Sequence, residues 1–233
     1  AEKCLKRSTM KKSKIFIACD TTKISKIKKI IKETNNSELK IGYKLGLEFL
    51  NSKNGRNFLT KLKNKITFAD LKLHDIPNTC KSTIKAIKDL KVNYVTIHIS
   101  SGLEALKAAK KASGKIKLIG VTILTSLNNK ALKEVGFDRN VKKLVLHQAK
   151  LANKAKLDAI VCSAQEIKLV RKIFKREIIT PGIRFTQKTN DQKRVLTPIE
   201  AYANGADWLV IGRDLTTGNI KKNTQILIDH LNK

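Results

Sequence analysis

The chain of 233 residues contains few acidic and few aromatic residues. Its 19 acidic residues stand against 49 basic ones, which gives a formal net charge of +30, and aromatic residues make up 5%. So basic a chain suggests nucleic-acid binding. However, 41 of the basic residues are lysines spread along the whole chain, whereas readers of nucleic acid favour clustered arginine and stacking aromatic side chains. We therefore keep a basic nucleic-acid-binding protein only as an alternative, and expect the positive field to favour an anionic substrate.

Long apolar segments and paired cysteines are also missing. No apolar run approaches the roughly 18 residues that a membrane-spanning helix needs, so no membrane partner is expected. The four cysteines, Cys4, Cys19, Cys80 and Cys162, include no C-x-x-C pair, which predicts reduced thiols in a cytoplasmic protein and no zinc site. Residues 1–12 are basic and lack the apolar core of a secretory signal, so we expect an N-terminal extension or tag remnant.

The remaining residues, 13–233, are predicted to form one domain, because no low-complexity linker divides them. Short apolar runs, typical of buried strands, alternate with longer amphipathic stretches, typical of helices. Eight such pairs predict a single (β/α)8 TIM barrel, with an open doubly wound sheet as the alternative from pattern alone. The expected strands are residues 15–20, 39–45, 66–73, 94–99, 116–124, 159–163, 177–180 and 208–212, and the expected helices are residues 25–32, 57–63, 79–90, 103–112, 141–154, 164–175, 198–204 and 223–231.

The most informative segment is residues 70–79, Asp-Leu-Lys-Leu-His-Asp-Ile-Pro-Asn-Thr, at the end of the third expected strand. Side chains two apart in a strand point the same way, so Asp70 and Lys72 are expected on one face. Asp75 lies just past the strand, before a proline that suits the first turn of a helix. A lysine between carboxylates stays protonated, so it can stabilise a developing anion and then donate a proton. A surface cluster of salt bridges is the alternative interpretation.

Polar residues also stand at the ends of the other expected strands. In barrel enzymes the C-terminal strand ends form the active site, and the loops after strands seven and eight often hold phosphate. Gly212 and Arg213 open the last helical segment, where backbone N–H groups favour an anion. The strand-end set is Asp20, Lys44, Asp70, Lys72, Thr125, residues 181–184, Gly212 and Arg213.

With these motifs the chain resembles the bacterial orotidine 5′-phosphate decarboxylase family, from about residue 15 onward. The matching pieces occur in the family's order, and residues 70–79 are the most specific of them. The resemblance implies a homodimeric barrel without metal or organic cofactor that converts orotidine 5′-monophosphate to uridine 5′-monophosphate. The pieces are residues 18–20, 44–49, 70–79, 121–126, 180–184, 191–192 and 211–213.

The resemblance also implies a role for each matching position. Lys44, Asp70, Lys72 and Asp75 look like the charged network beside the scissile carboxylate, with Lys72 as the proton donor and Asp70 facing the departing group. In the family the second aspartate reaches into the partner's site, so Asp75 would act in trans with Thr79 nearby. The remaining implied roles are ribose contacts for Asp20 and Lys44, a pyrimidine contact for Thr125, the ends of a phosphate-covering loop for Arg184 and Gln192, and the phosphate grip for Gly212 and Arg213.

One departure and two rival functions remain. After the fourth strand the family has a His-Ala-x-Gly-Gly-like turn, whereas here Ser101 replaces a glycine; we expect His98 to be a core histidine and His74 to be structural. Mg²⁺-dependent sugar-phosphate enzymes of the same superfamily share D-x-K-x-x-D but carry an acidic metal ligand where Lys44 stands, and a cation cannot ligate Mg²⁺. A catalytically inactive barrel is disfavoured because every expected charged position is present.

Overall fold

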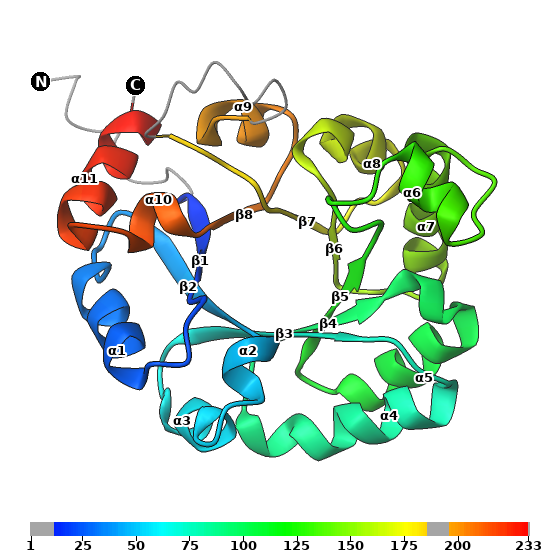
Figure 1. Ribbon diagram of the computed structural model, residues 1–233, viewed down its shortest axis with the longest axis horizontal. Helices are drawn as coiled ribbons and strands as arrows, with labels where there is room; N and C mark the ends of the chain where they lie inside the picture. The colour runs from blue at the N-terminus through cyan, green and yellow to red at the C-terminus, as the bar shows by residue number, and fades with distance from the viewer. Residues whose placement is uncertain (1–11, 186–195, 233) are drawn as a thin grey trace, which may run out of the picture.

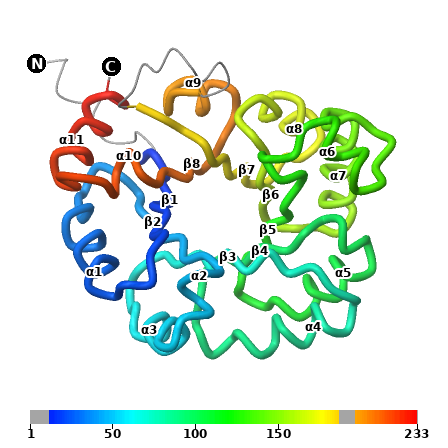
Figure 2. Tube along the Cα trace, viewed as in Figure 1, coloured from blue at the N-terminus to red at the C-terminus, as the bar shows by residue number. Residues whose placement is uncertain are grey.

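Eight parallel strands pair in chain order and close on themselves, β8 against β1, so the predicted TIM barrel is confirmed and the open sheet is excluded (Figures 1 and 2). The computed structural model describes residues 12–185 and 196–232. The strands are β1 (Lys14–Ala18), β2 (Lys40–Gly46), β3 (Ile66–Leu73), β4 (Tyr94–His98), β5 (Lys117–Val121), β6 (Ala159–Val161), β7 (Glu177–Thr180) and β8 (Trp208–Ile211).

The helices lie outside the ring of strands in Figure 1. They are α1 (Ile24–Glu33), α2 (Leu47–Leu50), α3 (Gly55–Lys61), α4 (Pro77–Ala86), α5 (Leu103–Ser113), α6 (Asn129–Glu134), α7 (Val141–Lys154), α8 (Ile167–Ile173), α9 (Pro198–Ala203), α10 (Arg213–Thr216) and α11 (Ile220–Leu231), with 3₁₀ turns η2 (Ile87–Leu90), η3 (Ile99–Ser101) and η4 (Ala164–Glu166). No helix in the described ranges is long and apolar enough to span a bilayer.

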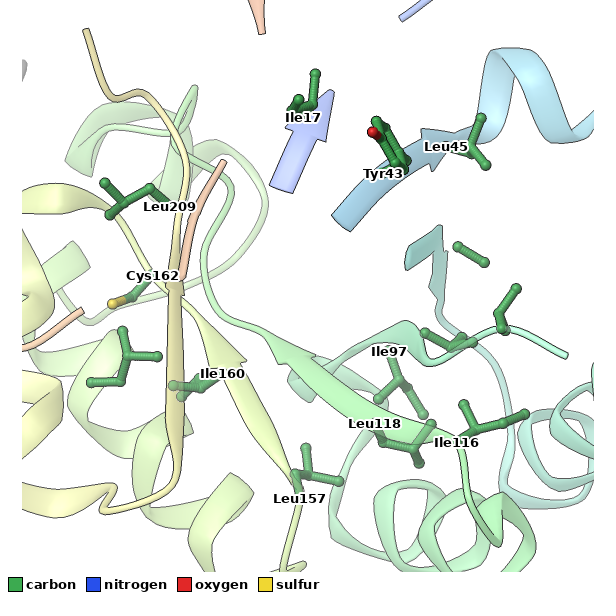
Figure 3. Close-up of a cluster of buried hydrophobic side chains, with 14 of the residues drawn as sticks. Ile17, Tyr43, Leu45, Ile97, Ile116, Leu118, Leu157, Ile160, Cys162 and Leu209 are labelled. Atoms are coloured by element: carbon green, nitrogen blue, oxygen red, sulfur yellow. The ribbon is translucent and has the colours of Figure 1, made fainter. Parts of the chain in front are cut away.

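Outward-facing strand residues form one apolar layer beneath the helices. Figure 3 shows Ile17, Leu45 and Leu118 among its members, all nearly inaccessible to solvent. Helix α1 illustrates the matching face, because it buries Ile27 and Ile30 while the lysines between and beside them stay exposed. Part of the large positive charge therefore lies on solvated helix faces.

Aromatic side chains fill the lower interior of the barrel, at the N-terminal ends of the strands. Phe16 stacks on Trp208 with ring centroids 4.1 Å apart and meets Phe68 and Tyr94 edge to face. A Cβ atom at Gly42 would lie 2.5 Å from the Phe16 ring, so only glycine lets β2 pass this ring without displacement.

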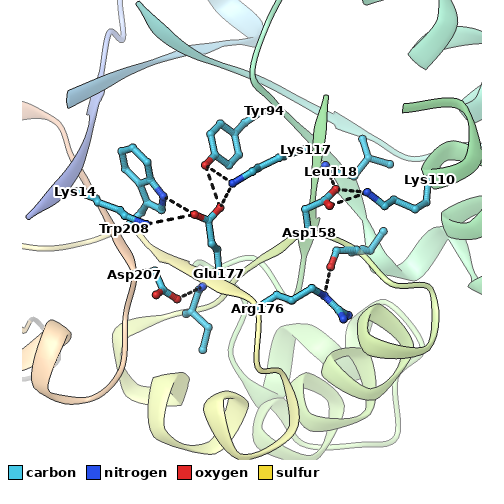
Figure 4. A network of polar contacts seen from close by, with 12 residues as sticks. Lys14, Tyr94, Lys110, Lys117, Leu118, Asp158, Arg176, Glu177, Asp207 and Trp208 are labelled. Carbon is cyan, nitrogen blue, oxygen red and sulfur yellow. Dashed lines mark hydrogen bonds and ion pairs between the residues drawn. The ribbon is translucent and has the colours of Figure 1, made fainter. Parts of the chain in front are cut away.

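Glu177, the first residue of β7, closes this end of the barrel. Figure 4 shows Lys14, Lys117, Tyr94 and Trp208 converging on its carboxylate, at 3.0–3.4 Å. Burial raises the pKa of Glu177, but the hydrogen bonds and charge of Lys117 and the bonds from Tyr94 and Trp208 outweigh it, so the pKa lies below its ordinary value. The lower end is thus a packed plug in which one carboxylate is held by two lysines and two aromatic donors.

Several predicted boundaries were wrong, for physical reasons. The fifth strand ends at Val121 rather than at residue 124, because Ile123 and Leu124 leave the sheet to line a cavity. The last helix begins at Ile220, three residues earlier than predicted, because the Asn219 side chain accepts a hydrogen bond from the Lys222 backbone N–H and caps it. The short helices α2, α6 and α10 were not predicted as separate elements.

Candidate active site

Three charged side chains meet at the C-terminal ends of β2 and β3. Lys72 Nζ lies 2.8 Å from Asp70 Oδ2, and Lys44 Nζ lies 3.5 Å from the same oxygen. Lys44 also pairs with Asp20 at 3.4 Å, just beyond the end of β1. The sequence prediction that these four residues share one end of the barrel is therefore confirmed.

Asp70 is the buried centre of this group, with a side chain that is 10% exposed. Burial alone raises the pKa of Asp70. The charges of Lys44 and Lys72, with hydrogen bonds from Lys72 and Thr96, outweigh burial and hold the pKa below its ordinary value. The site thus presents an ionised carboxylate between two ammonium groups at neutral pH.

A bulge on β3 aims Lys72 into the barrel. From Ala69 to Leu73 strand β3 advances four residues, while its partner β4 advances only two, from Val95 to Ile97. Lys72 has φ 47°, in the left-handed region that costs a non-glycine residue roughly 1–3 kcal/mol. Strict alternation placed Asp70 and Lys72 correctly on one face, but the strand that joins them is not regular.

Thr96 on β4 joins the charged group, and the sequence analysis missed it. Its Oγ1 accepts a hydrogen bond from the Lys72 backbone N–H at 2.8 Å and donates one to Asp70 Oδ1 at 3.0 Å. The available signal was a hydroxyl residue in the middle of the mostly apolar strand Tyr-Val-Thr-Ile-His, at the alternation position that faces the interior.

The charged side chains line two cavities of about 230 Å³ each. Lys44, Asp70 and Lys72 border both. One cavity extends over apolar residues such as Val121, Val161 and Val210 and also contacts Thr125. The other extends toward Asp20 and the β1 and β2 ends. A larger cavity of about 570 Å³ adjoins the first and is lined by Thr125 and Arg184 among others.

Asp75 and Thr79 do not reach these cavities within their own chain. Asp75 is exposed in the turn between β3 and α4, and its Oδ1 accepts the backbone N–H of Ile76 at 2.7 Å. Among the described residues no ion pair joins Asp75 to Lys72. Thr79 lies in the first turn of α4, close to Ile76, which is 66% exposed.

The two histidines near the site lie beside one another. The rings of His74 and His98 have centroids 5.4 Å apart. His98 is half-buried, so the expectation of a core histidine was wrong; it ends β4 at the barrel mouth, where the chain turns outward. Burial, reinforced by nearby His74 and Lys72, lowers the pKa of His98, which favours the neutral ring. His74 is exposed. Among the described residues it contacts His98 and Ser100 rather than the charged cluster.

The predicted phosphate residues lie where β7 and β8 end. Gly212 sits beside the end of β1, because a Cβ there would be 3.6 Å from the Ala18 Cβ and 3.8 Å from Asp20 Oδ2, and Arg213 is exposed at the start of α10. Arg184 pairs with Asp214 at 2.6 Å, and Asp214 also accepts the Phe185 N–H at 3.1 Å. Arg184 thus fastens the segment after β7 to α10. Gln192 lies outside the described residues.

Comparison with known proteins agrees with this geometry. The family model described as "Orotidine 5'-phosphate decarboxylase / HUMPS family" matches residues 13–224. A protein of Wolbachia pipientis subsp. Culex pipiens named orotidine 5′-phosphate decarboxylase is 44% identical over 227 residues, which cover 93% of this chain and 98% of that protein. A protein of the same name from Carboxydothermus hydrogenoformans is 40% identical over 223 residues, covering 90% of this chain and 91% of that protein.

Solved structures show the same barrel. The crystal structure of orotidine 5′-phosphate decarboxylase from Lactobacillus acidophilus superposes with a TM-score of 0.81 at 28% identity, covering 95% of this chain and all of that chain. The corresponding enzyme structure from Methanocaldococcus jannaschii, at 22% identity and a TM-score of 0.76, shows the likeness of fold alone.

Proposed function

The chain belongs to the orotidine 5′-phosphate decarboxylase / HUMPS family, and from this membership we propose how its residues carry out decarboxylation. The activity is that of the named relatives, a carboxy-lyase reaction that converts orotidine 5′-monophosphate to uridine 5′-monophosphate in pyrimidine biosynthesis. The roles of individual residues are our proposal.

Lys72 is the central group of the proposed mechanism. Loss of CO₂ leaves a carbanion on the pyrimidine ring, which delocalises poorly and must be stabilised by electrostatics. The Lys72 ammonium, 2.8 Å from Asp70, supplies a fixed positive charge beside the cavity and then donates its proton to the same carbon. Asp70 orients Lys72 and faces the departing carboxylate.

The observation that carries the proposal is the alternation of charge from Lys72 to Asp70 to Lys44 along the cavity wall. Asp70 is held ionised by its neighbours, so neither lysine needs to rearrange when negative charge develops. Such preorganised charges stabilise a transition state without a reorganisation cost at the moment of reaction.

The same arrangement disfavours the Mg²⁺-dependent sugar-phosphate branch of the family. A Mg²⁺ site needs oxygen ligands in an octahedral arrangement. Here the Lys44 ammonium lies between Asp20 and Asp70, where it repels a divalent cation and takes one oxygen of each carboxylate. The donor set therefore fits a charged side-chain network better than a metal.

The rest of the nucleotide can be assigned to the surrounding residues. Asp20 and Lys44 border the cavity at the β1 and β2 ends and would hold ribose hydroxyls. Thr125 borders the other of the two cavities, the one that extends over Val121, Val161 and Val210, and would contact the pyrimidine. Arg213 would grip the phosphate together with the Gly212 backbone; because α10 has only four residues, the arginine charge carries most of this contact. Gln192 is proposed to act from the segment after β7.

A homodimer with shared active sites completes the proposal. Asp75 and Thr79 are turned away from their own cavity, and Ile76 between them exposes an apolar side chain next to α4. A single exposed isoleucine is ordinary on a protein surface, so the proposal rests on the position of Asp75 outside its own cavity and on the family membership. We place Asp75 and Thr79 of each subunit in the site of the other.

The proposed location is the cytoplasm. Cys19, Cys80 and Cys162 are free and buried, in keeping with a reducing compartment.

The test follows the loss of orotidine 5′-monophosphate absorbance with purified protein, beside the Lys72→Ala variant. Turnover by the wild type and none by the variant would support both the activity and the role of Lys72. Near-normal turnover by the variant would contradict the role, and no turnover by a folded wild type would contradict the activity.

A further inference from the structure

We propose that Thr96 is a positioning residue of the decarboxylase, whose single hydroxyl fixes both the Lys72 backbone and the Asp70 carboxylate. The inference rests on the proposed roles of Lys72 and Asp70. Thr96 borders the same cavity as Lys72 and Asp70, but its hydroxyl is engaged by the Lys72 N–H and by Asp70, so it acts through these two residues.

The bulge on β3 creates the need for such a residue. In a regular parallel pair, each N–H that points to the neighbouring strand finds a carbonyl there. Between Ala69 and Leu73 this register is lost, and a bulge leaves a backbone group without its ladder partner. The Lys72 N–H instead donates to Thr96 Oγ1 at 2.8 Å, so a side chain replaces the missing backbone acceptor.

The hydrogen bond from the Lys72 N–H also determines where the Thr96 hydroxyl donates its proton. A threonine hydroxyl carries one proton and can accept hydrogen bonds through its lone pairs. Because Oγ1 accepts from the Lys72 N–H, its proton is available for Asp70 Oδ1, 3.0 Å away. Oδ2, the other oxygen of Asp70, is left for the two lysine ammonium groups. Thr96 thus assigns each carboxylate oxygen to a separate partner.

Burial makes this arrangement rigid. Thr96 is 1% exposed, and a β-branched side chain in a strand has few accessible rotamers. Without the hydroxyl, the Lys72 N–H would lose its acceptor, and the left-handed conformation of Lys72 would lose the contact that holds it. The ammonium would then no longer be held 2.8 Å from Asp70.

Thr96→Val removes the hydroxyl while keeping the shape of the side chain, and Thr96→Ser keeps the hydroxyl while removing a methyl group. Hydrogen bonds to charged groups correspond to rate factors of about 10- to 100-fold when lost. We therefore expect the single-turnover decarboxylation rate of Thr96→Val to fall by about this factor, with KM little changed, and Thr96→Ser to recover most of the loss.

Thr67→Val is the matched control. Thr67 is also buried, lies near the N-terminal end of β3, and its hydroxyl bonds Asn93 at 3.4 Å, far from the charged cluster along the strand. It should reproduce any general cost of deleting a buried strand hydroxyl without slowing the chemical step. If Thr96→Val does not fold, Thr96→Ala against Thr96→Ser makes the same comparison.

Amide hydrogen exchange at Lys72 provides a readout independent of activity. The Lys72 N–H should exchange slowly in the wild type and in Thr96→Ser, and faster in Thr96→Val. The inference is overturned if Thr96→Val retains the wild-type rate, if Thr67→Val is slowed equally, or if serine restores nothing. If the wild type decarboxylates normally in the same assay, such a result contradicts the role of Thr96 and leaves the proposed activity standing.

Discussion

Sharing of the active site between two subunits can be tested by restoring activity from two inactive chains. Lys72 and Asp75 are three residues apart in sequence, yet the first lines the cavity and the second is exposed beyond the strand end. Suppose that each site uses Lys72 of its own chain and Asp75 of the partner subunit. A homodimer of either variant, Lys72→Ala or Asp75→Ala, then has two inactive sites.

Mixing the two variants should restore a defined fraction of the wild-type activity. A heterodimer holds one site that lacks both residues and one site that lacks neither. With equal amounts and free exchange, about half of all dimers are heterodimers, and half of their sites are intact, so activity should recover to about a quarter of wild type. The assay is nucleotide turnover after mixing, with native mass measurement of the heterodimer fraction.

The control and the refuting outcome follow from the same arithmetic. Mixing Lys72→Ala with Asp70→Ala should restore nothing, because Asp70 and Lys72 lie in one chain with contacting side chains, so every site lacks at least one of them. If heterodimers form and Lys72→Ala with Asp75→Ala stays inactive, Asp75 acts within its own chain. The exposed position of Asp75 would then need a different explanation.

Four further outcomes are expected. Lys72→Ala should bind uridine 5′-monophosphate at reduced affinity while losing decarboxylation in single-turnover assays, because its charge acts mainly in the transition state. Dialysis against EDTA should leave activity intact and added Mg²⁺ should not raise it, because Lys44 occupies the space between Asp20 and Asp70; recovery by Mg²⁺ after loss would contradict this. Arg213→Ala should weaken binding of the nucleotide about 10- to 100-fold in calorimetry and leave that of uridine unchanged, because only the nucleotide carries phosphate. Glu177→Gln should lower the free energy of unfolding at pH 7 by about 1–3 kcal/mol in denaturant titrations. Because the folded-state pKa of Glu177 is depressed, its contribution is full above the unfolded pKa and is lost as the pH falls through the folded value, so the difference between the proteins should shrink below about pH 4; a constant difference would contradict the charge-based account.

The sequence predicted the barrel and much of its mouth because both depend on local periodicity. Parallel strands present their C-terminal ends together, so polar residues after several apolar runs had to meet. The contacts of Asp70 with Lys44 and Lys72 confirm this. The end of the fifth strand was less predictable, because Ile123 and Leu124 are as apolar as strand residues although they line a cavity.

Features that depend on pairing between distant segments were not predictable. A two-residue period assumes a regular strand, so it could not indicate the bulge that gives Lys72 its left-handed backbone. Thr96 resembles any β-branched strand residue until that bulge supplies it with a donor. Likewise, the partner of Arg184 lies 30 residues away on α10, and only the closed barrel brings Asp214 within 2.6 Å.

The plug beneath the charged cluster also determines how the gaseous product leaves. Phe16, Phe68, Tyr94 and Trp208 are each at most 4% exposed, and Glu177 closes the same end with its ring of partners. Carbon dioxide released beside Asp70 therefore has no exit through the floor of the barrel in the part of the chain that is described. On the proposed assignment of the active site, it leaves through the barrel mouth, the same end at which the nucleotide would bind.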